Sequence, residues 1–349
     1  MTTSDSESRR GAAWLNALVL VCAIVFLAAL WLPRIQGARE AGRRNRCGHQ
    51  IKELAGAVAN GAQTRDGRLP GYLEPLPLDR SIALGDGRIT AEARVSWLVA
   101  ILPMLEQEKL YRHWSSGDAL RKKAAADDSV ANGYLPSLVC PSSGLSARTP
   151  PPCSYAVNTG RQDVRAAAPS YGKAGWPADW RANGVFFNRY IDARDNPAGA
   201  PRTEMTYDYL RQGDGSSLTV MLAERLDCGS YAALPPSAGA TEAALGVVWW
   251  PFNQLAGPPR SRRINGPRDR LAIGNARPAS NHPCGVMVAF CDGHSRFISE
   301  DIDYGIYCKL LAPNDAACND PGSLAPVPGD ASNSYDRIRH GTLDESMIN

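Results

Sequence analysis

The hydrophobic pattern is dominated by one long apolar segment near the start of the chain. Between Arg10 and Arg34 there is no charged residue, and Asn16 is the only strongly polar residue within residues 12–32. At about 1.5 Å per residue, a helix over this segment reaches roughly 31 Å, the thickness of a bilayer's hydrocarbon core. The segment therefore predicts a transmembrane helix over residues 12–32, with a lipid bilayer as its partner.

The alternative is a secretory signal peptide that is removed after export. Signal peptides have an apolar core of about 7–15 residues, followed by a small-x-small cleavage site. The apolar run here is longer, and no such site follows within it. Trp14 and Trp31 also lie near its two ends, where indole rings prefer the interface between lipid and water. These features favour a retained anchor.

The helical pattern continues beyond Pro33 in amphipathic form. Apolar residues recur with helical spacing at Cys47, Ile51, Leu54, Ala55 and Val58. Pro33 is expected to bend the helix rather than end it, and Asn60-Gly61 is a plausible stop. We predict one long helix from about residue 11 to residue 60, of which residues 33–60 are the amphipathic part.

The rest of the chain shows short apolar runs separated by turn residues. Residues 61–92 carry Gly, Pro and Asp at short intervals, which is typical of turns and short strands. The clearest soluble helix is predicted over residues 96–111. Strands are predicted over residues 184–187, 218–222, 247–250, 285–291 and 294–299. Residues 1–8 and the Pro/Gly/Ser-rich tail 319–349 are expected to be flexible.

Composition narrows the class of protein. The 349 residues carry a net charge of +3, which is too mild to indicate a nucleic-acid partner. Of the nine cysteines, Cys22 lies in the apolar run and eight lie beyond it. An even number of cysteines beyond a membrane anchor favours an oxidising compartment with disulfides. The spacings contain no paired C-x-x-C motif, so a structural zinc site is not expected.

The charges that flank the apolar run predict the opposite orientation, with the C-terminal part of the chain in the cytoplasm. Two arginines precede it and five follow it closely, whereas positive charge usually marks the cytoplasmic side. We give the distal cysteines more weight than this count, and we expect the C-terminal part of the chain to lie outside the cytoplasm.

The N-terminal residues carry a resemblance to a known family. Arg-Arg-Gly, an apolar helix, a proline and then residues 36–47 (Gln-Gly-Ala-Arg-Glu-Ala-Gly-Arg-Arg-Asn-Arg-Cys) resemble the start of type IV prepilin-like proteins. More narrowly, the chain resembles the bacterial prepilin-like family of unknown function that carries a C-terminal H-x9-D-G motif. The resemblance implies a leader that ends at Gly11, with possible cleavage after it, and packing against other pilin-like subunits through the N-terminal helix.

Two positions depart from that family's pattern. Such proteins usually have an aromatic or apolar residue first and a glutamate fifth in the mature chain, where this chain has Ala12 and Asn16. The glutamate pairs with the terminal amine of a neighbouring subunit in filaments. Asn16 therefore leaves open two alternatives, a subunit that assembles and an anchored domain that does not.

Further segments of the chain match the same family in separate islands. Leu138-Val139-Cys140-Pro141 matches its strand followed by Cys-Pro, and residues 153–158 match the strand after it. A Cys140–Cys153 disulfide would close the intervening loop. Asp214-Gly215 opens a segment that resembles the family's Asp-Gly-Thr-Ser-Asn-Thr and continues into a strand that ends in Glu224.

The most specific signal is the motif that runs from His282 to Asp292-Gly293, with nine residues between the histidine and the aspartate. Its pattern predicts a β-hairpin with a type I′ turn at Asp292-Gly293. Val286, Val288 and Phe290 should share one face of the first strand, and Met287, Ala289 and Cys291 the other. With both faces apolar, this strand should lie inside its sheet.

The motif also contains residue types that could do chemistry. His282, Asp292, His294 and Glu224 could in principle form a metal or acid–base site. His282 and Asp292, however, are expected at opposite ends of one strand, and we interpret His282, Asp292, Gly293, Asp214 and Gly215 as structural. No catalytic residue, cofactor or metal is expected.

Together these observations predict an α+β protein with a long N-terminal helix and an antiparallel sheet in an extracytoplasmic domain. The expected segments are a leader-like 1–11, a transmembrane 12–32, an amphipathic 33–60, a domain over 61–318 and a tail over 319–349. The first functional hypothesis is a pilin-like or pseudopilin-like structural component of secretion in the inner membrane. The alternatives are a non-assembling anchored binding domain and, less favoured, a hydrolase that uses His282 or Glu224.

Overall fold

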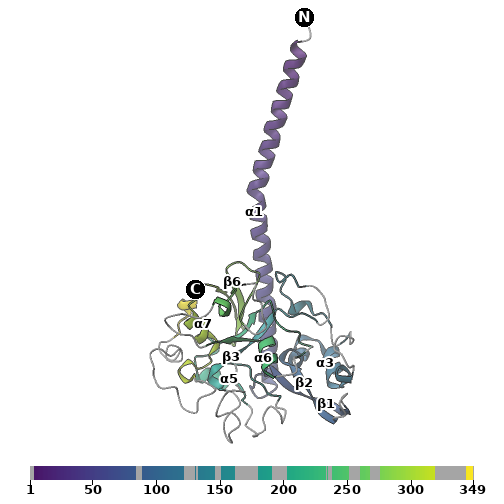
Figure 1. Cartoon of the computed structure of the whole chain (residues 1–349), viewed down its shortest axis with the longest axis vertical. Coiled ribbons are helices and arrows are strands. Elements are labelled where there is room, and N and C mark those ends of the chain that lie inside the picture. Colours follow the sequence, from purple (N-terminus) through teal and green to yellow (C-terminus); the bar gives the residue numbers. More distant parts are fainter. Residues whose placement is uncertain are drawn as a thin grey trace. The chain divides into compact units, whose positions relative to one another are not determined.

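The structure is a computed structural model of the chain (Figure 1). It describes residues 4–83, 89–121, 130, 133–145, 151–161, 180–190, 203–232, 234, 238–250, 260–267, 276–318 and 343–348. The chain divides into two compact units, Met1–Asn45 and Arg46–Asn349. The boundary between the units falls within the predicted amphipathic part 33–60, whose apolar stripe from Cys47 onward lies in the second unit.

Helix α1 spans Ser4–Gln63 and is continuous across Pro33. It begins earlier and ends later than the expected 11–60, and residues 4–8 are helical. Within the second unit its buried side chains include all those of the predicted stripe, Cys47, Ile51, Leu54, Ala55 and Val58, together with Ala57 and Ala62. Taken over the described residues, no helix combines the length and the apolar character that a bilayer crossing needs. The transmembrane segment at 12–32 therefore stays a prediction.

The second unit contains two sheets. A two-stranded antiparallel sheet pairs β1 (Leu73–Ala83) with β2 (Ile89–Ser96). A five-stranded sheet has the order β5-β3-β4-β6-β7, with β3 at Tyr155–Arg161, β4 at Val220–Glu224, β5 at Gly246–Trp249, β6 at Gly285–Phe290 and β7 at Ser295–Ser299. Its pairings are antiparallel except for the parallel β3–β5 pair. The α+β class with antiparallel pairing is confirmed.

Short helices complete the second unit. The α-helices are α2 (Trp97–Ile101), α3 (Glu108–Ser115), α4 (Asp118–Arg121), α5 (Tyr207–Gln212), α6 (Ala238–Leu245) and α7 (Tyr304–Leu311). The 3-10 turns are η1 (Leu102–Leu105), η2 (Pro136–Leu138), η4 (Arg181–Asn183), η5 (Arg260–Arg262), η8 (Asp315–Ala317) and η9 (Glu345–Ile348).

The prediction of one continuous helix over residues 96–111 is wrong. This segment is divided into α2, η1 and α3. Pro103 lies in the first turn of η1, where its missing N–H costs nothing, and Glu106 adopts the left-handed conformation (φ 59°), which ends the turn. The strand predicted over 184–187 is also wrong. Its Val185 and Phe186 N–H groups both donate to the carbonyl of Asn158, so the chain bends there instead of pairing along a ladder.

Two apolar clusters lie on opposite faces of the five-stranded sheet. Met287, Ala289 and Cys291 belong to the cluster that contains the buried stripe of α1. Val286, Val288 and Phe290 belong to the cluster that contains Tyr307 and Leu311 of α7. The predicted alternation along β6 is confirmed, and β6 lies inside the sheet between β4 and β7, as expected. The second unit is therefore layered, with α1 on one face of the sheet and α7 on the other.

This layering yields a matched pair of substitutions on α1. Leu54→Ala removes a fully buried side chain, and we expect it to lower the free energy of unfolding by about 2–5 kcal/mol. Lys52→Ala, on the exposed face two residues away, should change it by less than about 0.5 kcal/mol. Denaturant unfolding followed by tryptophan fluorescence measures both. Equal effects would show that the stripe of α1 does not pack as described.

Candidate functional site

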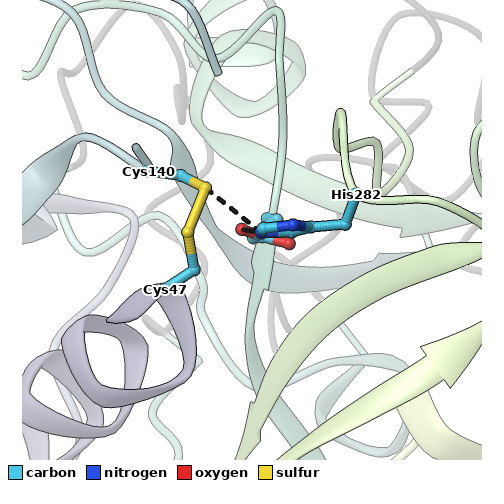
Figure 2. A group of neighbouring side chains, drawn as sticks. Cys47, Cys140 and His282 are labelled. Atoms are coloured by element: carbon cyan, nitrogen blue, oxygen red, sulfur yellow. Dashed lines mark hydrogen bonds and ion pairs between the residues drawn. A yellow bond between two sulfur atoms is a disulfide. The ribbon is translucent and has the colours of Figure 1, made fainter. Parts of the chain in front are cut away.

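Four side chains from distant parts of the chain meet on one face of the sheet. They are Cys47, Cys140, Glu224 and His282, and all four are buried. One atom of each, a sulfur, a nitrogen or an oxygen, lies within 4.8 Å of the others. Figure 2 shows the Cys47–Cys140 disulfide with the ring of His282 pointing toward it. We call this group the cysteine–histidine cluster.

Cys47 reaches the cluster because α1 lies very close to the sheet. The next residue, Gly48, is buried, and a Cβ atom placed there would come within 2.9 Å of the Met287 Cε. Only glycine allows this approach without displacing Met287. Gly48 thus lets α1 lie directly against the Met287 side chain of β6.

Cys140 follows η2, and two hydrogen bonds to carbonyl groups of η2 hold the segment before it in place. The Gln50 side chain of α1 donates to the Pro136 carbonyl (3.0 Å), and the Ser154 N–H donates to the Leu138 carbonyl (2.8 Å). The disulfide joins Cys140 to Cys47, 93 residues earlier. The predicted Cys140–Cys153 bridge is therefore wrong, and Cys153 is a free, buried thiol.

Glu224 ends β4 and is fixed from the neighbouring strand. Its Oε2 accepts a hydrogen bond from the Met287 N–H (2.8 Å), so the carboxylate takes part in the β4–β6 pairing. Its Oε1 lies 3.3 Å from the His282 Nε2. That nitrogen is also 3.4 Å from the Cys140 Sγ. The imidazole edge therefore faces both the carboxylate and the disulfide.

The turn that carries His282 is tightly bonded to its surroundings. The Ser280 Oγ donates to the Gly285 carbonyl (2.7 Å) and accepts from the His282 N–H (3.1 Å). Cys284 adopts the left-handed conformation (φ 65°), which favours glycine. The backbone of the turn thus sets the direction of the imidazole.

The cluster lies in a buried, partly charged environment. A small hollow beside it is lined by Cys140, Glu224 and the buried Arg225. Burial, together with the nearby Glu224 charge, holds the pKa of the Tyr155 hydroxyl well above its usual range. In such surroundings water screens charges weakly, so the groups of the cluster interact strongly with one another or with a bound cation.

Asp292 and Gly293, which end the motif, and the neighbouring His294 follow the C-terminal end of β6. Asp292 Oδ1 lies 2.6 Å from the His294 Nδ1 and accepts from the His294 N–H (3.0 Å). The structure therefore brings His282 together with Glu224 and pairs Asp292 with His294 instead. His282 precedes β6 and Asp292 follows it, as the sequence predicts.

The turn at Asp292-Gly293 differs from the predicted type I′ turn. That type needs positive φ at both central residues, whereas Gly293 has φ 90° and Asp292 is not among the described residues with positive φ. The Gly293 N–H donates to the Phe290 carbonyl and the Phe290 N–H donates to the His294 carbonyl, each at 2.9 Å. This is a three-residue loop in which glycine takes the bulge position.

Asp214 and Gly215 lie beside this turn and do not join the cluster. The Asp292 N–H donates to the Ser216 carbonyl (3.1 Å), so the two Asp-Gly segments are neighbours. Asp214 Oδ2 accepts from the Asp315 N–H (2.8 Å), and burial raises the pKa of Asp214 to about 6. Gly11 lies within α1. Structural roles for these residues remain an interpretation.

The sequence pattern indicates two members of the cluster, Glu224 and His282, as candidate ligands, but it does not show that they meet Cys47 and Cys140. Glu224 and His282 were considered as ligands alongside Asp292 and His294. Cys47 was read as part of an apolar stripe, and Cys140 was assigned to Cys153. The available signal was that each of the four residues stands in a segment of family resemblance. Nothing in their spacing along the chain shows that they meet.

The disulfide yields a stability prediction. In oxidising buffer, the Cys47→Ser/Cys140→Ser variant should lose about 2–5 kcal/mol of unfolding free energy, the range typical for removal of a native disulfide. In reducing buffer most of the difference from the wild type should vanish. Denaturant unfolding in both buffers measures the effect, with Cys284→Ser, at an exposed free thiol, as the control. An unchanged midpoint in oxidising buffer would contradict the bridge.

Comparison with known proteins assigns the chain to a family. No curated protein and no solved structure matches it. Residues 36–305, more than half of the chain, match the family described as "Protein of unknown function (DUF1559)", and all four cluster residues lie in this range. The chain belongs to that family of proteins of unknown function (DUF1559).

Proposed function

We propose that the chain is a membrane-anchored, pilin-like structural protein associated with secretion. Its second unit lies outside the cytoplasm and does no catalysis. The observation that carries the proposal is a single helix with two different apolar surfaces. The part in the second unit buries one stripe, and the part before it exposes apolar side chains in every direction.

The exposed part of α1 needs a cover other than water. Large apolar side chains are 55–66% exposed at Leu18, Val19, Leu20, Val21, Ile24, Val25, Phe26 and Leu27. Four successive residues of a helix, 100° apart, already face most of its circumference. A helix that is apolar all round is buried in a protein core or spans a membrane. With no charged residue between Arg10 and Arg34, the bilayer is the cover we propose.

The Cys47–Cys140 disulfide supports export of the second unit. Stable structural disulfides persist in oxidising compartments and are rare in the cytosol. The disulfide favours an exported second unit, whereas the count of arginines around the apolar run predicts a cytoplasmic one. We give the disulfide more weight, because the bridge is buried and joins α1 to the sheet layer.

The geometry of the cluster supports a structural role over hydrolysis. His282 is 2% exposed and Glu224 is 1% exposed, so a substrate cannot reach either side chain in this conformation. Their contacts join β4, the turn before β6 and the disulfide. Together they attach α1 to the sheet, which is what an anchored unit needs when force acts on its tether.

The second candidate is an anchored binding domain that does not assemble. Asn16 favours it, because it removes the glutamate that pairs subunits in pilin-like filaments. A hollow of about 330 Å³, lined by the polar residues Asp292, His294 and Arg296 and by the apolar Phe290 and Ile348, among others, gives such a domain a surface for a ligand.

Membrane attachment and export are tested together. The native protein should stay in the membrane pellet after alkaline carbonate extraction, and a variant lacking residues 12–32 should not. In spheroplasts, a membrane-impermeant maleimide should label the exposed Cys284, and Cys284→Ser should abolish that labelling. Labelling only after lysis would place the second unit in the cytoplasm and overturn the proposed orientation.

Assembly is tested by a cysteine scan of the exposed part of α1. Single cysteines at positions 18 to 27, in a background without Cys22 and Cys284, should form oxidative cross-links between chains in native membranes. If helices pack as in pilins, cross-linking should recur every three to four residues, because one face is shared. Absence of cross-links at every position would favour the non-assembling binding domain.

A further inference from the structure

We propose that, before the Cys47–Cys140 disulfide forms, the four residues of the cysteine–histidine cluster bind one Zn²⁺ ion. The ligands are the two cysteine thiolates, the His282 Nε2 and the Glu224 carboxylate. The inference concerns the second unit alone and holds whether or not the chain is membrane-anchored or assembles.

The arrangement fits a tetrahedral metal site. Zinc is bound by sulfur at about 2.3 Å and by nitrogen or oxygen at about 2.0–2.2 Å, so ligand atoms in a tetrahedron lie about 3.3–3.8 Å apart. The His282 Nε2 lies 3.4 Å from the Cys140 Sγ and 3.3 Å from the Glu224 Oε1. The four ligand atoms lie within 4.8 Å of one another. In a tetrahedral site the two sulfurs would lie about 3.8 Å apart, so the disulfide must open before the ion binds.

The orientation of Glu224 points to a ligand in the cluster. Its Oε2 is held by the Met287 N–H, whereas its buried Oε1 faces the His282 Nε2 at 3.3 Å without the geometry of a hydrogen bond and has no hydrogen bond within the described structure. A buried carboxylate oxygen without a hydrogen bond is costly, and a cation removes that cost. The same bond to Met287 would fix the carboxylate as a ligand, because partners that orient a ligand also raise metal affinity.

The chemistry requires the thiol form, in which the chain is synthesised. Binding of Zn²⁺ displaces one proton from each cysteine, and the ion carries two positive charges against two thiolates and one carboxylate. The buried Arg225, which lines the same small hollow, is paired with Asp227 at 2.8 Å, so the charge of the site rests mainly on its own ligands and the ion. Oxidation by the disulfide of another protein transfers two electrons to that disulfide, forms the Cys47–Cys140 bond and releases the ion. The two states are alternative links between α1 and the sheet.

The direct test uses the full-length wild-type protein in detergent micelles. A phosphine with one water molecule reduces the disulfide to two thiols and becomes the phosphine oxide. Under anaerobic conditions the reduced protein should bind one Zn²⁺ per chain, measured by titration with a competing chelator, and the oxidised protein should not. Co²⁺ in the same site should give thiolate-to-cobalt charge-transfer absorption. Bound Zn²⁺ should protect Cys47 and Cys140 from alkylation, as read by peptide mass spectrometry, while the exposed Cys284 stays reactive.

Variants separate this site from other thiols. Loss of a group that only orients a ligand lowers metal affinity about 10- to 100-fold, so His282→Ala should lower it by more than about 100-fold. Glu224→Gln, which keeps an oxygen for the Met287 N–H, should lower it at least tenfold. His49→Ala, at an exposed histidine two residues from Cys47, should leave it unchanged.

The competing dithiol is Cys153 with Cys228, whose sulfurs both contact the Tyr155 carbonyl, at 3.2 Å and 3.3 Å. Protection confined to these two residues would overturn the proposal. So would full affinity in His282→Ala, or no binding by the reduced wild-type protein. Because the alkylation pattern is read on the wild type, the test does not depend on a variant that folds.

Discussion

The structure depends most on how the second part of α1 is held against the five-stranded sheet. An amphipathic helix on a sheet gains stability from buried area, but that contact alone fixes neither its position along its axis nor its rotation. Here the Cys47–Cys140 disulfide supplies a covalent limit, and Glu224 and His282 supply oriented polar contacts beside it. The apolar stripe around Leu54 then packs in one register. The cluster is the point at which α1, β4, the turn before β6 and the loop after η2 become one body.

Much of the fold could be predicted, because local patterns were strong. The stripe from Cys47 to Val58 and the alternation along β6 are repeats that burial imposes directly on the sequence, and both are seen in the structure. Two of the wrong predictions about local structure depend on a single backbone angle each. Glu106 in the left-handed conformation divides the helix predicted over 96–111. Gly293 alone, without Asp292, takes positive φ at the hairpin loop. Neither residue type requires these conformations, so the sequence pattern could not assign them.

The candidate site was harder to predict than the fold. Its four members are separated by dozens of residues or more along the chain, and no periodicity relates residue 47 to residue 140. The short distance along the chain favours Cys153 as the disulfide partner of Cys140. The layered packing instead places Cys47 of α1 next to Cys140, and these two residues form the disulfide. Residues that act together through tertiary contacts leave little trace in a single sequence. The family match over residues 36–305 covers all four but assigns them no role.

The close approach at Gly48 has a consequence for how the length of α1 can vary. Inserting one residue into a helix rotates everything beyond it by about 100°. Between Cys47 and Leu54 such an insertion would turn either the sulfur or the apolar stripe away from the sheet, and a larger residue at position 48 would displace the flexible end of the Met287 side chain. Upstream of Cys47 no comparable contact fixes the phase of the helix within the described residues. A change in the length of α1 before Cys47 would therefore leave both the disulfide and the apolar stripe in place against the sheet.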